Sequence, residues 1–188
     1  QGFEYSYRLS NMRVIGGKIG GIRLHPPSNL PVRPTTDIAK EALFNILEHQ
    51  IDWDDCSCLD LFCGTGNISF ELASRGATEV DAIDIHSKCL FYVKDIAKQY
   101  DLNISTRKAD VFKFVASCKK KYDFIFADPP YDVGQLPQLP QMILDNGLLK
   151  EGGILVVEHP SMRKLVEHPL FVETRKYGYS SFSFYQNK

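Results

Sequence analysis

The four residues Asp128-Pro129-Pro130-Tyr131 place a carboxylate, two rigid rings and an aromatic face directly after an apolar run at residues 122–127. Such a run, bounded by turn residues, predicts a buried strand. Proline donates no ladder hydrogen bond and restricts the residue before it, so the strand must end in a stiff, extended turn. The Asp128 carboxylate and the Pro129 carbonyl can accept the two hydrogens of an exocyclic amine while Tyr131 stacks on its base. The alternative is a simple Pro-Pro turn with a capping aspartate.

A glycine-rich turn follows another apolar run at residues 59–62 and precedes a helix-like stretch at 67–75. Its glycines, Gly64 and Gly66, permit positive φ and let a ligand approach the backbone closely. A turn of this kind between a strand and a helix start predicts a nucleotide-type loop. Ser69 stands where a dinucleotide-binding loop has its third glycine. The pattern therefore favours a smaller adenosyl ligand.

Two further acids end later strand-like segments. Asp84 lies 18 residues after Gly66, a distance at which an acid reaches the ribose hydroxyls in a βαβ unit. Asp110 can accept from an adenine amino group. Each acid can instead cap the helix that follows it. Together with Phe62 and Asp128 they would face one rim of the sheet, where open α/β sheets bind ligands.

Strands and helices alternate from residue 58 onward, which predicts a parallel sheet with helices on both faces. Near the N-terminus, β-forming residues broken by Gly-Gly pairs predict a hairpin within 12–25, followed by a helix capped by Thr36. After Pro160 we expect a short helical segment and then an antiparallel hairpin at the sheet edge. The expected strands are 58–63, 80–85, 104–109, 122–127, 153–158, 170–176 and 180–186, and the expected helices of the alternating region are 67–75, 87–100, 111–118 and 136–146.

Composition points to an ordinary globular protein of 188 residues, with 44% hydrophobic and 24% charged residues. No apolar run approaches the roughly 20 residues of a membrane span, and no signal-peptide pattern opens the chain, so we expect a cytoplasmic protein that does not contact a membrane. The five cysteines lack the spacing of a zinc site. We therefore expect reduced thiols and no metal.

The net charge of −1 hides an asymmetry along the chain. Residues 1–40 carry +4, from six Lys or Arg and two acids, and the remainder carries −5. A basic arm on a mildly acidic body is a reasonable footprint for RNA. Counts over so short a segment also fluctuate by a few charges, so a solvated surface is the alternative.

The order of glycine-rich loop, ribose acid, adenine acid and Asp-Pro-Pro-Tyr resembles class I S-adenosylmethionine-dependent methyltransferases that methylate amines. Three N-terminal motifs narrow the resemblance to the bacterial RsmD-like family: Met12-Arg-Val-Ile-Gly-Gly-Lys18, Leu30-Pro-Val-Arg-Pro-Thr-Thr-Asp37 and Glu41-Ala-Leu-Phe-Asn-Ile-Leu47. The likeness runs from Met12 to the C-terminus. Cys63 stands where some members carry Ala, and Tyr131 where some carry Phe; neither departure disturbs the chemistry.

This resemblance implies methylation of N2 of a guanine in 16S ribosomal RNA. It also implies a Rossmann-like, mostly parallel seven-stranded sheet with a C-terminal antiparallel hairpin. The expected domains are a hairpin-and-helix extension over 12–50, which covers RNA or cofactor, and a methyltransferase domain over 51–188. Residues 1–11 begin with Gln-Gly, the end of a common protease-site scar. They are a vector remnant, an upstream start or a native extension, and carry no functional argument.

The expected cofactor is S-adenosylmethionine, which leaves as S-adenosylhomocysteine. The expected partner is ribosomal RNA, free or within an assembling small subunit, and the protein is expected to be a monomer. Cofactor contacts are expected from Asp60, Phe62, Cys63, Gly64, Thr65, Gly66, Asn67, Asp84, Ile85, Asp110 and Val111, with Phe44 near the methionine portion. Substrate contacts are expected from Lys18, Arg33, Thr35 and Thr36, and catalytic roles for Asp128, Pro129, Pro130 and Tyr131.

Asp128 can act as a hydrogen-bond acceptor for the amine or as a base for the cationic product, and both readings stay open. Three other classes share parts of the pattern. A DNA adenine-N6 methyltransferase uses the same motif, but 188 residues leave little room for its target-recognition region. A protein glutamine methyltransferase uses an Asn-headed version, and a non-catalytic nucleotide-binding module would not need the Asp-Pro-Pro-Tyr turn.

Overall fold

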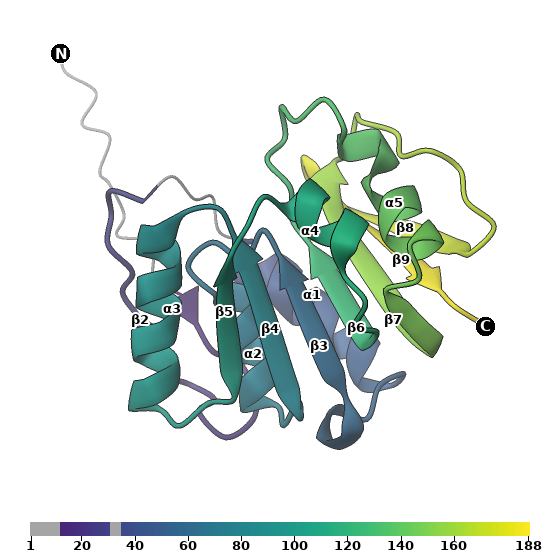
Figure 1. Cartoon of the computed structure of the whole chain (residues 1–188). Helices are drawn as coiled ribbons and strands as arrows, with labels where there is room; N and C mark the ends of the chain where they lie inside the picture. The colour runs from purple at the N-terminus through teal and green to yellow at the C-terminus, as the bar shows by residue number, and fades with distance from the viewer. Residues whose placement is uncertain (1–11, 31–34) are drawn as a thin grey trace, which may run out of the picture.

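The computed structural model describes residues 12–30 and 35–188, which are built around one large sheet (Figure 1). Its strands are β3 (Ser57–Leu61), β4 (Glu79–Asp84), β5 (Ile104–Lys108), β6 (Tyr122–Ala127), β7 (Leu149–Pro160), β8 (Phe171–Tyr177) and β9 (Ser180–Gln186). The helices are α1 (Asp37–Glu48), α2 (Asn67–Ser74), α3 (Ser87–Gln99), α4 (Val111–Ser117) and α5 (Leu139–Asp145), with short 3-10 turns η1 (Trp53–Asp55) and η2 (Leu136–Gln138).

The seven strands lie in the order β5-β4-β3-β6-β7-β9-β8. The first five are parallel, and β9 runs antiparallel to both β7 and β8. The carboxyl ends of the parallel strands therefore meet at one rim. The expected fold class, including the closing hairpin, is confirmed.

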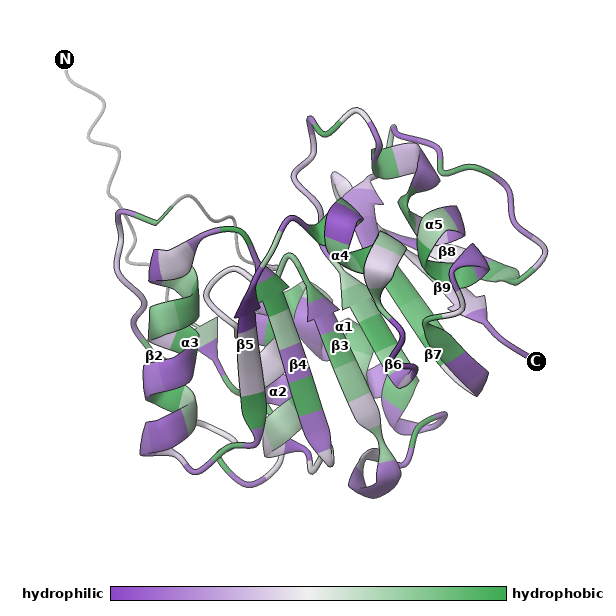
Figure 2. Ribbon diagram, in the orientation of Figure 1, coloured by the Kyte–Doolittle hydropathy of each residue, from purple (hydrophilic) through white to green (hydrophobic). Residues whose placement is uncertain are grey.

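Helices cover both faces of the sheet, with α4 and α5 on one side and α1 and α2 on the other (Figure 1). Side chains of β6 point alternately to the two faces: Phe124 and Phe126 join the core under α1 and α2, while Ile125 joins the core under α4 and α5. A strand buried on both faces reads as a continuous apolar run. Figure 2 shows β6 and the middle of β7 mainly in green, whereas α3 alternates between purple and green bands.

The N-terminal hairpin, β1 (Met12–Arg13) with β2 (Arg23–Leu24), packs against α2 and α3. Gly17 is required there: its φ is +78°, and an added Cβ would lie 1.9 Å from the Ser74 carbonyl oxygen. Residues 12–24 are thereby fixed to the end of α2.

A buried ion pair ties this hairpin to two helices. Lys40 Nζ lies 3.1 Å from Glu71 Oε1, and both side chains are 0% exposed. Glu71 also accepts from the backbone N–H groups of Ile15 and Gly16 at 2.8 and 2.9 Å and from Arg75 Nε at 2.8 Å. Burial lowers the pKa of Lys40, and Glu71 opposes that effect. Burial alone would raise the pKa of Glu71, but Lys40 and the other donors lower it overall.

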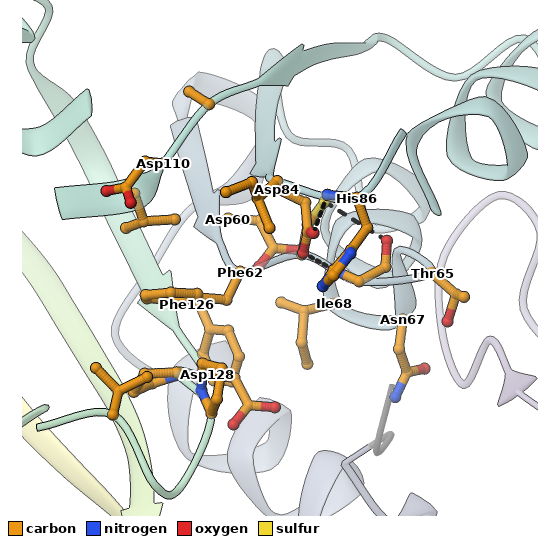
Figure 3. Close-up of a pocket in the computed structure, with 18 of the residues that line it drawn as sticks. Asp60, Phe62, Thr65, Asn67, Ile68, Asp84, His86, Asp110, Phe126 and Asp128 are labelled. Atoms are coloured by element: carbon orange, nitrogen blue, oxygen red, sulfur yellow. Dashed lines mark hydrogen bonds between the residues drawn. The ribbon is translucent and has the colours of Figure 1, made fainter. Parts of the chain in front are cut away.

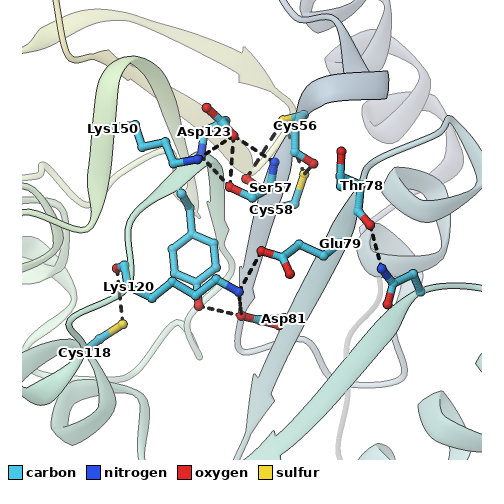
Figure 4. A network of polar contacts seen from close by, with 12 residues as sticks. Cys56, Ser57, Cys58, Thr78, Glu79, Asp81, Cys118, Lys120, Asp123 and Lys150 are labelled. Atoms are coloured by element: carbon cyan, nitrogen blue, oxygen red, sulfur yellow. Dashed lines mark hydrogen bonds and ion pairs between the residues drawn. The ribbon is translucent and has the colours of Figure 1, made fainter.

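Charged residues of opposite sign pair at the amino ends of the parallel strands, at the end of the sheet opposite the rim (Figure 4). Lys120 Nζ lies 2.8 Å from Glu79 and 2.9 Å from Asp81. Asp123 accepts from the Ser57 N–H at 2.9 Å and lies 3.3 Å from Lys150 Nζ. These contacts hold the strand starts together.

One expected element is wrong. The segment after Pro160 contains turns and no helix up to β8. Its backbone groups bond elsewhere: the Val166 N–H donates to the Pro137 carbonyl at 2.9 Å, and the Ser161 N–H to the Tyr179 carbonyl at 2.8 Å. The helix expected at 136–146 begins as a 3-10 turn and becomes α-helical at Leu139. Within the described ranges, no helix has the length and apolarity to cross a membrane.

Candidate active site

A cavity of about 480 Å³ opens at the rim where the parallel strands end (Figure 3). It is lined by residues that follow four neighbouring strands, β3 to β6. The lining residues are Thr35, Asp60, Phe62, Cys63, Gly64, Thr65, Asn67, Ile68, Asp84, Ile85, His86, Ala109, Asp110, Val111, Phe112, Phe126, Asp128, Pro129, Pro130, Tyr131 and Val133.

The loop after β3 has the backbone that its glycines allow. Gly66 has a φ of +89°, and an added Cβ would lie 2.9 Å from Val93 Cγ2 and 3.0 Å from the Phe70 ring. Phe62 also has a positive φ, of 59°, which is rare for a bulky residue and marks functional turns. Gly64, Thr65 and Asn67 of this turn line the cavity at the start of α2.

Asp84, at the end of β4, stabilises this loop. Its Oδ2 accepts from the Gly64 N–H at 2.9 Å, and its Oδ1 accepts from the His86 N–H at 2.9 Å (Figure 3). The side chain is 7% exposed. Each carboxylate oxygen has a second lone pair. Asp84 can therefore hold the loop and accept from two hydroxyl groups of a ligand.

Asp60, within β3, is 1% exposed and accepts from Ser69 Oγ at 2.7 Å. Burial raises its pKa to about 7, although the bonds from Ser69 oppose the shift. Asp110 is exposed, lines the cavity and caps α4 by accepting from the Lys113 N–H at 3.1 Å. Asp110 therefore caps α4 and also lines the cavity, and its contact with an adenine stays a prediction.

The Asp128–Tyr131 turn forms the other wall. The Asp128 N–H donates to the Leu61 carbonyl at 3.3 Å, which joins the turn to β3. Arg163 Nη1 donates to the carbonyls of Tyr131 and Val133 at 2.9 and 2.8 Å. The Tyr131 hydroxyl bonds Ser180 Oγ. The turn is therefore fixed from both of its flanks.

Four carboxylates line this cavity, and its described lining contains no Lys or Arg. Such a lining suits a cationic ligand and disfavours the phosphates of a dinucleotide. Among the described residues, no group of three or more His, Cys, Asp or Glu side chains could hold a metal ion. S-adenosylmethionine, with its sulfonium and ammonium groups and its uncharged adenosine, matches this donor set.

The cavity brings together most of the residues expected from the sequence. All four residues of the Asp128–Tyr131 turn line it, as do Thr35 and ten of the twelve expected cofactor residues. Gly66 lies in the same loop but not on the lining. Phe44 is 0% exposed and packs 5.8 Å from the Trp53 ring, within the core.

Two of the other expected substrate residues, Thr36 and Lys18, do not line the cavity. Thr36 caps α1 by accepting from the Ala39 N–H. Lys18 Nζ lies 3.4 and 3.3 Å from the carbonyl oxygens of Tyr100 and Asp101, at the end of α3 away from the rim. Arg33 is outside the described residues.

Sequence reasoning missed several residues at the site. His86 and Ile68 line the cavity, and Glu158, 2% exposed, accepts from Thr35 Oγ1 at 2.9 Å. Glu158 ends an expected strand, 153–158, in the same way as Asp84 ends its own, and that position was the available signal. No sequence signal pointed to Arg163, because its contacts with the carbonyls of Tyr131 and Val133 join residues that are far apart in the sequence.

The model of the family described as Conserved hypothetical protein 95 matches residues 12–186. The chain belongs to this family, the RsmD family. It is 34% identical over 188 residues to the putative rRNA methyltransferase YlbH of Bacillus subtilis, covering 94% of this chain and all of the relative. It is 33% identical over 150 residues to ribosomal RNA small subunit methyltransferase D of Escherichia coli, covering 78% and 74%.

Structural similarity agrees with this assignment. The putative methyltransferase yhhF from Escherichia coli superimposes with a TM-score of 0.82 at 28% identity, over 95% of this chain and 98% of the other. The resemblance drawn from the N-terminal motifs and the Asp-Pro-Pro-Tyr turn is therefore confirmed.

Proposed function

We propose that this protein transfers a methyl group from S-adenosylmethionine to the exocyclic N2 amine of a guanine in small-subunit ribosomal RNA. The observation that carries the proposal is the pairing, within one cavity, of an acid-lined cofactor pocket with the Asp128–Tyr131 turn. The names of the two relatives support ribosomal RNA as the substrate. The choice of guanine N2 comes from the RsmD-like resemblance.

The residues divide into two groups. The loop Phe62–Asn67 and Asp84 would hold the cofactor, with Asp60 beneath it and Asp110 beside its adenine. Once bound, S-adenosylmethionine supplies an activated methyl group on a sulfonium. The protein supplies position, and correct orientation of two reactants can be worth roughly 7–11 kcal/mol.

Asp128 and the Pro129 carbonyl would accept the two amine hydrogens. The amine is a poor nucleophile because its lone pair is delocalised into the ring, and these two bonds would localise that lone pair and direct it at the methyl group. The base must leave its stack, at a cost of a few kcal/mol, and the Tyr131 ring offers a replacement surface.

Substitutions of Asp128 test this proposal. Asp128→Ala removes an acceptor and should lower the single-turnover rate about 10²- to 10³-fold with little change in cofactor affinity. Asp128→Asn keeps one acceptor oxygen but cannot act as a base at neutral pH. It should retain part of the rate if Asp128 is an acceptor and fall with Ala if it is a base. A wild-type rate of methylation by Asp128→Ala would contradict the proposal.

Tyr131 provides a matched comparison. Tyr131→Ala removes the stacking face and should cost about ten- to a hundredfold in rate. Tyr131→Phe keeps that face, loses the hydroxyl that bonds Ser180 and should remain active. The modified nucleoside should be N2-methylguanosine, identified by mass spectrometry. A product on adenine N6, in DNA, would favour the alternative enzyme class.

A further inference from the structure

Two large side chains project into solvent at the rim beside the catalytic turn. Met162 is 95% exposed and Tyr179 is 92% exposed. At such exposure neither side chain contributes much burial to the fold. Single exposed apolar residues are normal, so exposure alone assigns no role. The surroundings of this pair are more informative.

Hydrogen bonds bring the two residues together. The Ser161 N–H donates to the Tyr179 carbonyl at 2.8 Å, and Ser161 Oγ donates to the Gly178 carbonyl at 3.1 Å. The β8–β9 turn therefore lies against the segment that contains Met162. Both residues stand next to well-fixed backbone, so an exposed ring here is presented at a defined place.

The same two segments hold the catalytic turn. Ser180, next to Tyr179, bonds the Tyr131 hydroxyl. Arg163, next to Met162, donates to the Tyr131 carbonyl at 2.9 Å. Each exposed side chain is thus one residue from a group that contacts Tyr131. The pair adjoins the side of the cavity assigned to the methyl acceptor, not the loop assigned to the cofactor.

Charge in this region favours a polyanion. Residues 160–180 contain four Lys or Arg and two acids, although residues 41–188 as a whole carry −5. Lys164 and Lys176 are exposed, and Lys176 lies opposite Ser181 in the β8–β9 pairing. One of the acids, Glu173, pairs with Arg175 at 2.9 Å. The segment that contains the exposed pair therefore has two more basic than acidic residues, whereas the acids of the site lie in the adjoining cavity.

We propose that Tyr179 and Met162 form a stacking platform for a nucleotide next to the methylated guanine in a single-stranded stretch of RNA. The inference rests on the proposed function. Unstacked RNA bases are recognised on aromatic side chains, with basic residues near the phosphates. A guanine turned into the cavity would leave its neighbour without a stacking partner. The exposed ring of Tyr179 replaces that partner.

Steady-state kinetics with unmodified 16S ribosomal RNA or small subunits, whichever the wild type methylates, tests the platform. Tyr179→Ala should raise KM for the substrate about five- to a hundredfold, while cofactor affinity stays at the wild-type value. Tyr179→Phe should restore most of the affinity, because it keeps the ring. Met162→Ala should give a smaller rise. Phe91→Ala is the control, since Phe91 is 67% exposed on α3, and should change nothing.

A photo-crosslinking phenylalanine analogue at position 179 identifies the contact directly. The expected product is a crosslink to RNA within a few nucleotides of the modified guanine. An unchanged KM for Tyr179→Ala, with active wild type, overturns the platform and leaves the proposed function intact. A crosslink to a ribosomal protein assigns the surface to a protein partner and also overturns it. A wild type that methylates no RNA overturns the proposed function itself, and the platform with it.

Discussion

The burial and the raised pKa of Asp60 bear on how the cavity would bind a cationic ligand. Asp60 is the most buried of the four carboxylates, at 1% exposed, and its pKa is raised to about 7. Near neutral pH the carboxyl of the ligand-free protein is therefore partly protonated. A cationic ligand nearby favours the ionised form, so its binding should displace that proton. We therefore expect cofactor binding and the ionisation of Asp60 to be coupled.

This coupling predicts a pH-dependent affinity. Binding of S-adenosylmethionine should tighten about tenfold between pH 6 and pH 8, because the proton no longer has to be removed above the pKa. Calorimetry in two buffers of different ionisation enthalpy should detect proton release near pH 7. Asp60→Asn should abolish the contribution of Asp60 to the pH dependence of the affinity and to the proton release. Only the contribution from titration of the ligand itself should remain. An affinity that follows the same pH profile in both proteins would contradict the role of Asp60.

Stability should respond in the opposite sense in the ligand-free protein. The folded-state pKa of Asp60 lies above the ordinary value of 3.8, so the folded chain binds the proton more tightly than the unfolded chain. The contribution is therefore favourable at low pH and is lost as the pH rises from about 4 toward 7. Burial of the Asp60 carboxyl should therefore make the ligand-free protein less stable at the same pH values at which the cofactor is expected to bind most tightly.

At the scale of elements, the alternation of apolar and polar segments was sufficient to place the parallel strands and their helices. The Pro-Pro turn predicted the strand end before Asp128, and an acid at the end of a strand-like segment predicted the strand end at Asp84. Both residues line the cavity. The helix expected after Pro160 failed because local pattern carries no information about long-range partners. Backbone groups of that segment bond η2 and β9 instead. The positive φ of Phe62 could not be predicted either, since bulky residues rarely adopt it.

The contact between α1, α2 and the hairpin depends on the Lys40–Glu71 pair, and its two halves are not equivalent. Without Lys40, Glu71 keeps Arg75 and two backbone N–H donors. Without the Glu71 charge, the buried ammonium keeps hydrogen bonds to the neutral oxygens of Arg13 and Asn67 and a weaker attraction to Asp37. Breaking a buried pair costs about 3–5 kcal/mol when a charge is left uncompensated.

Glu71→Gln should therefore lower the free energy of unfolding by more than Lys40→Met does, and by about 3–5 kcal/mol. Urea denaturation with both variants measures the difference. Lys120→Met is the surface control, because its partners are about 40% and 21% exposed, and it should cost less than about 1 kcal/mol. Equal losses from Glu71→Gln and Lys40→Met would show that the other donors of Glu71 contribute little.

Across the molecule, the cavity is lined by residues that lie in or directly after β3, β4, β5 and β6, so a bound ligand would connect four of the seven strands. A ligand at 100 times its Kd adds about 2.7 kcal/mol to the stability of the folded state. For a chain of this size that corresponds to a rise in Tm of about 5–11 °C. The effect should appear with S-adenosylhomocysteine in a thermal scan. Asp84→Ala should remove most of it, and NAD should give none with the wild type.

The order of the sheet has a further consequence for association between molecules. Its two outermost strands are β5 and β8, and among the described residues each has a strand neighbour on one side only. Exposed Arg107 and Lys108 occupy β5, and exposed Arg175 and Lys176 occupy β8. Charged side chains on an edge strand discourage edge-to-edge pairing with another copy, which is a common route to aggregation. We therefore expect little edge-to-edge pairing between copies in concentrated solution. The least protected part of β8 is its start, where Phe171 and Val172 are 47% and 52% exposed.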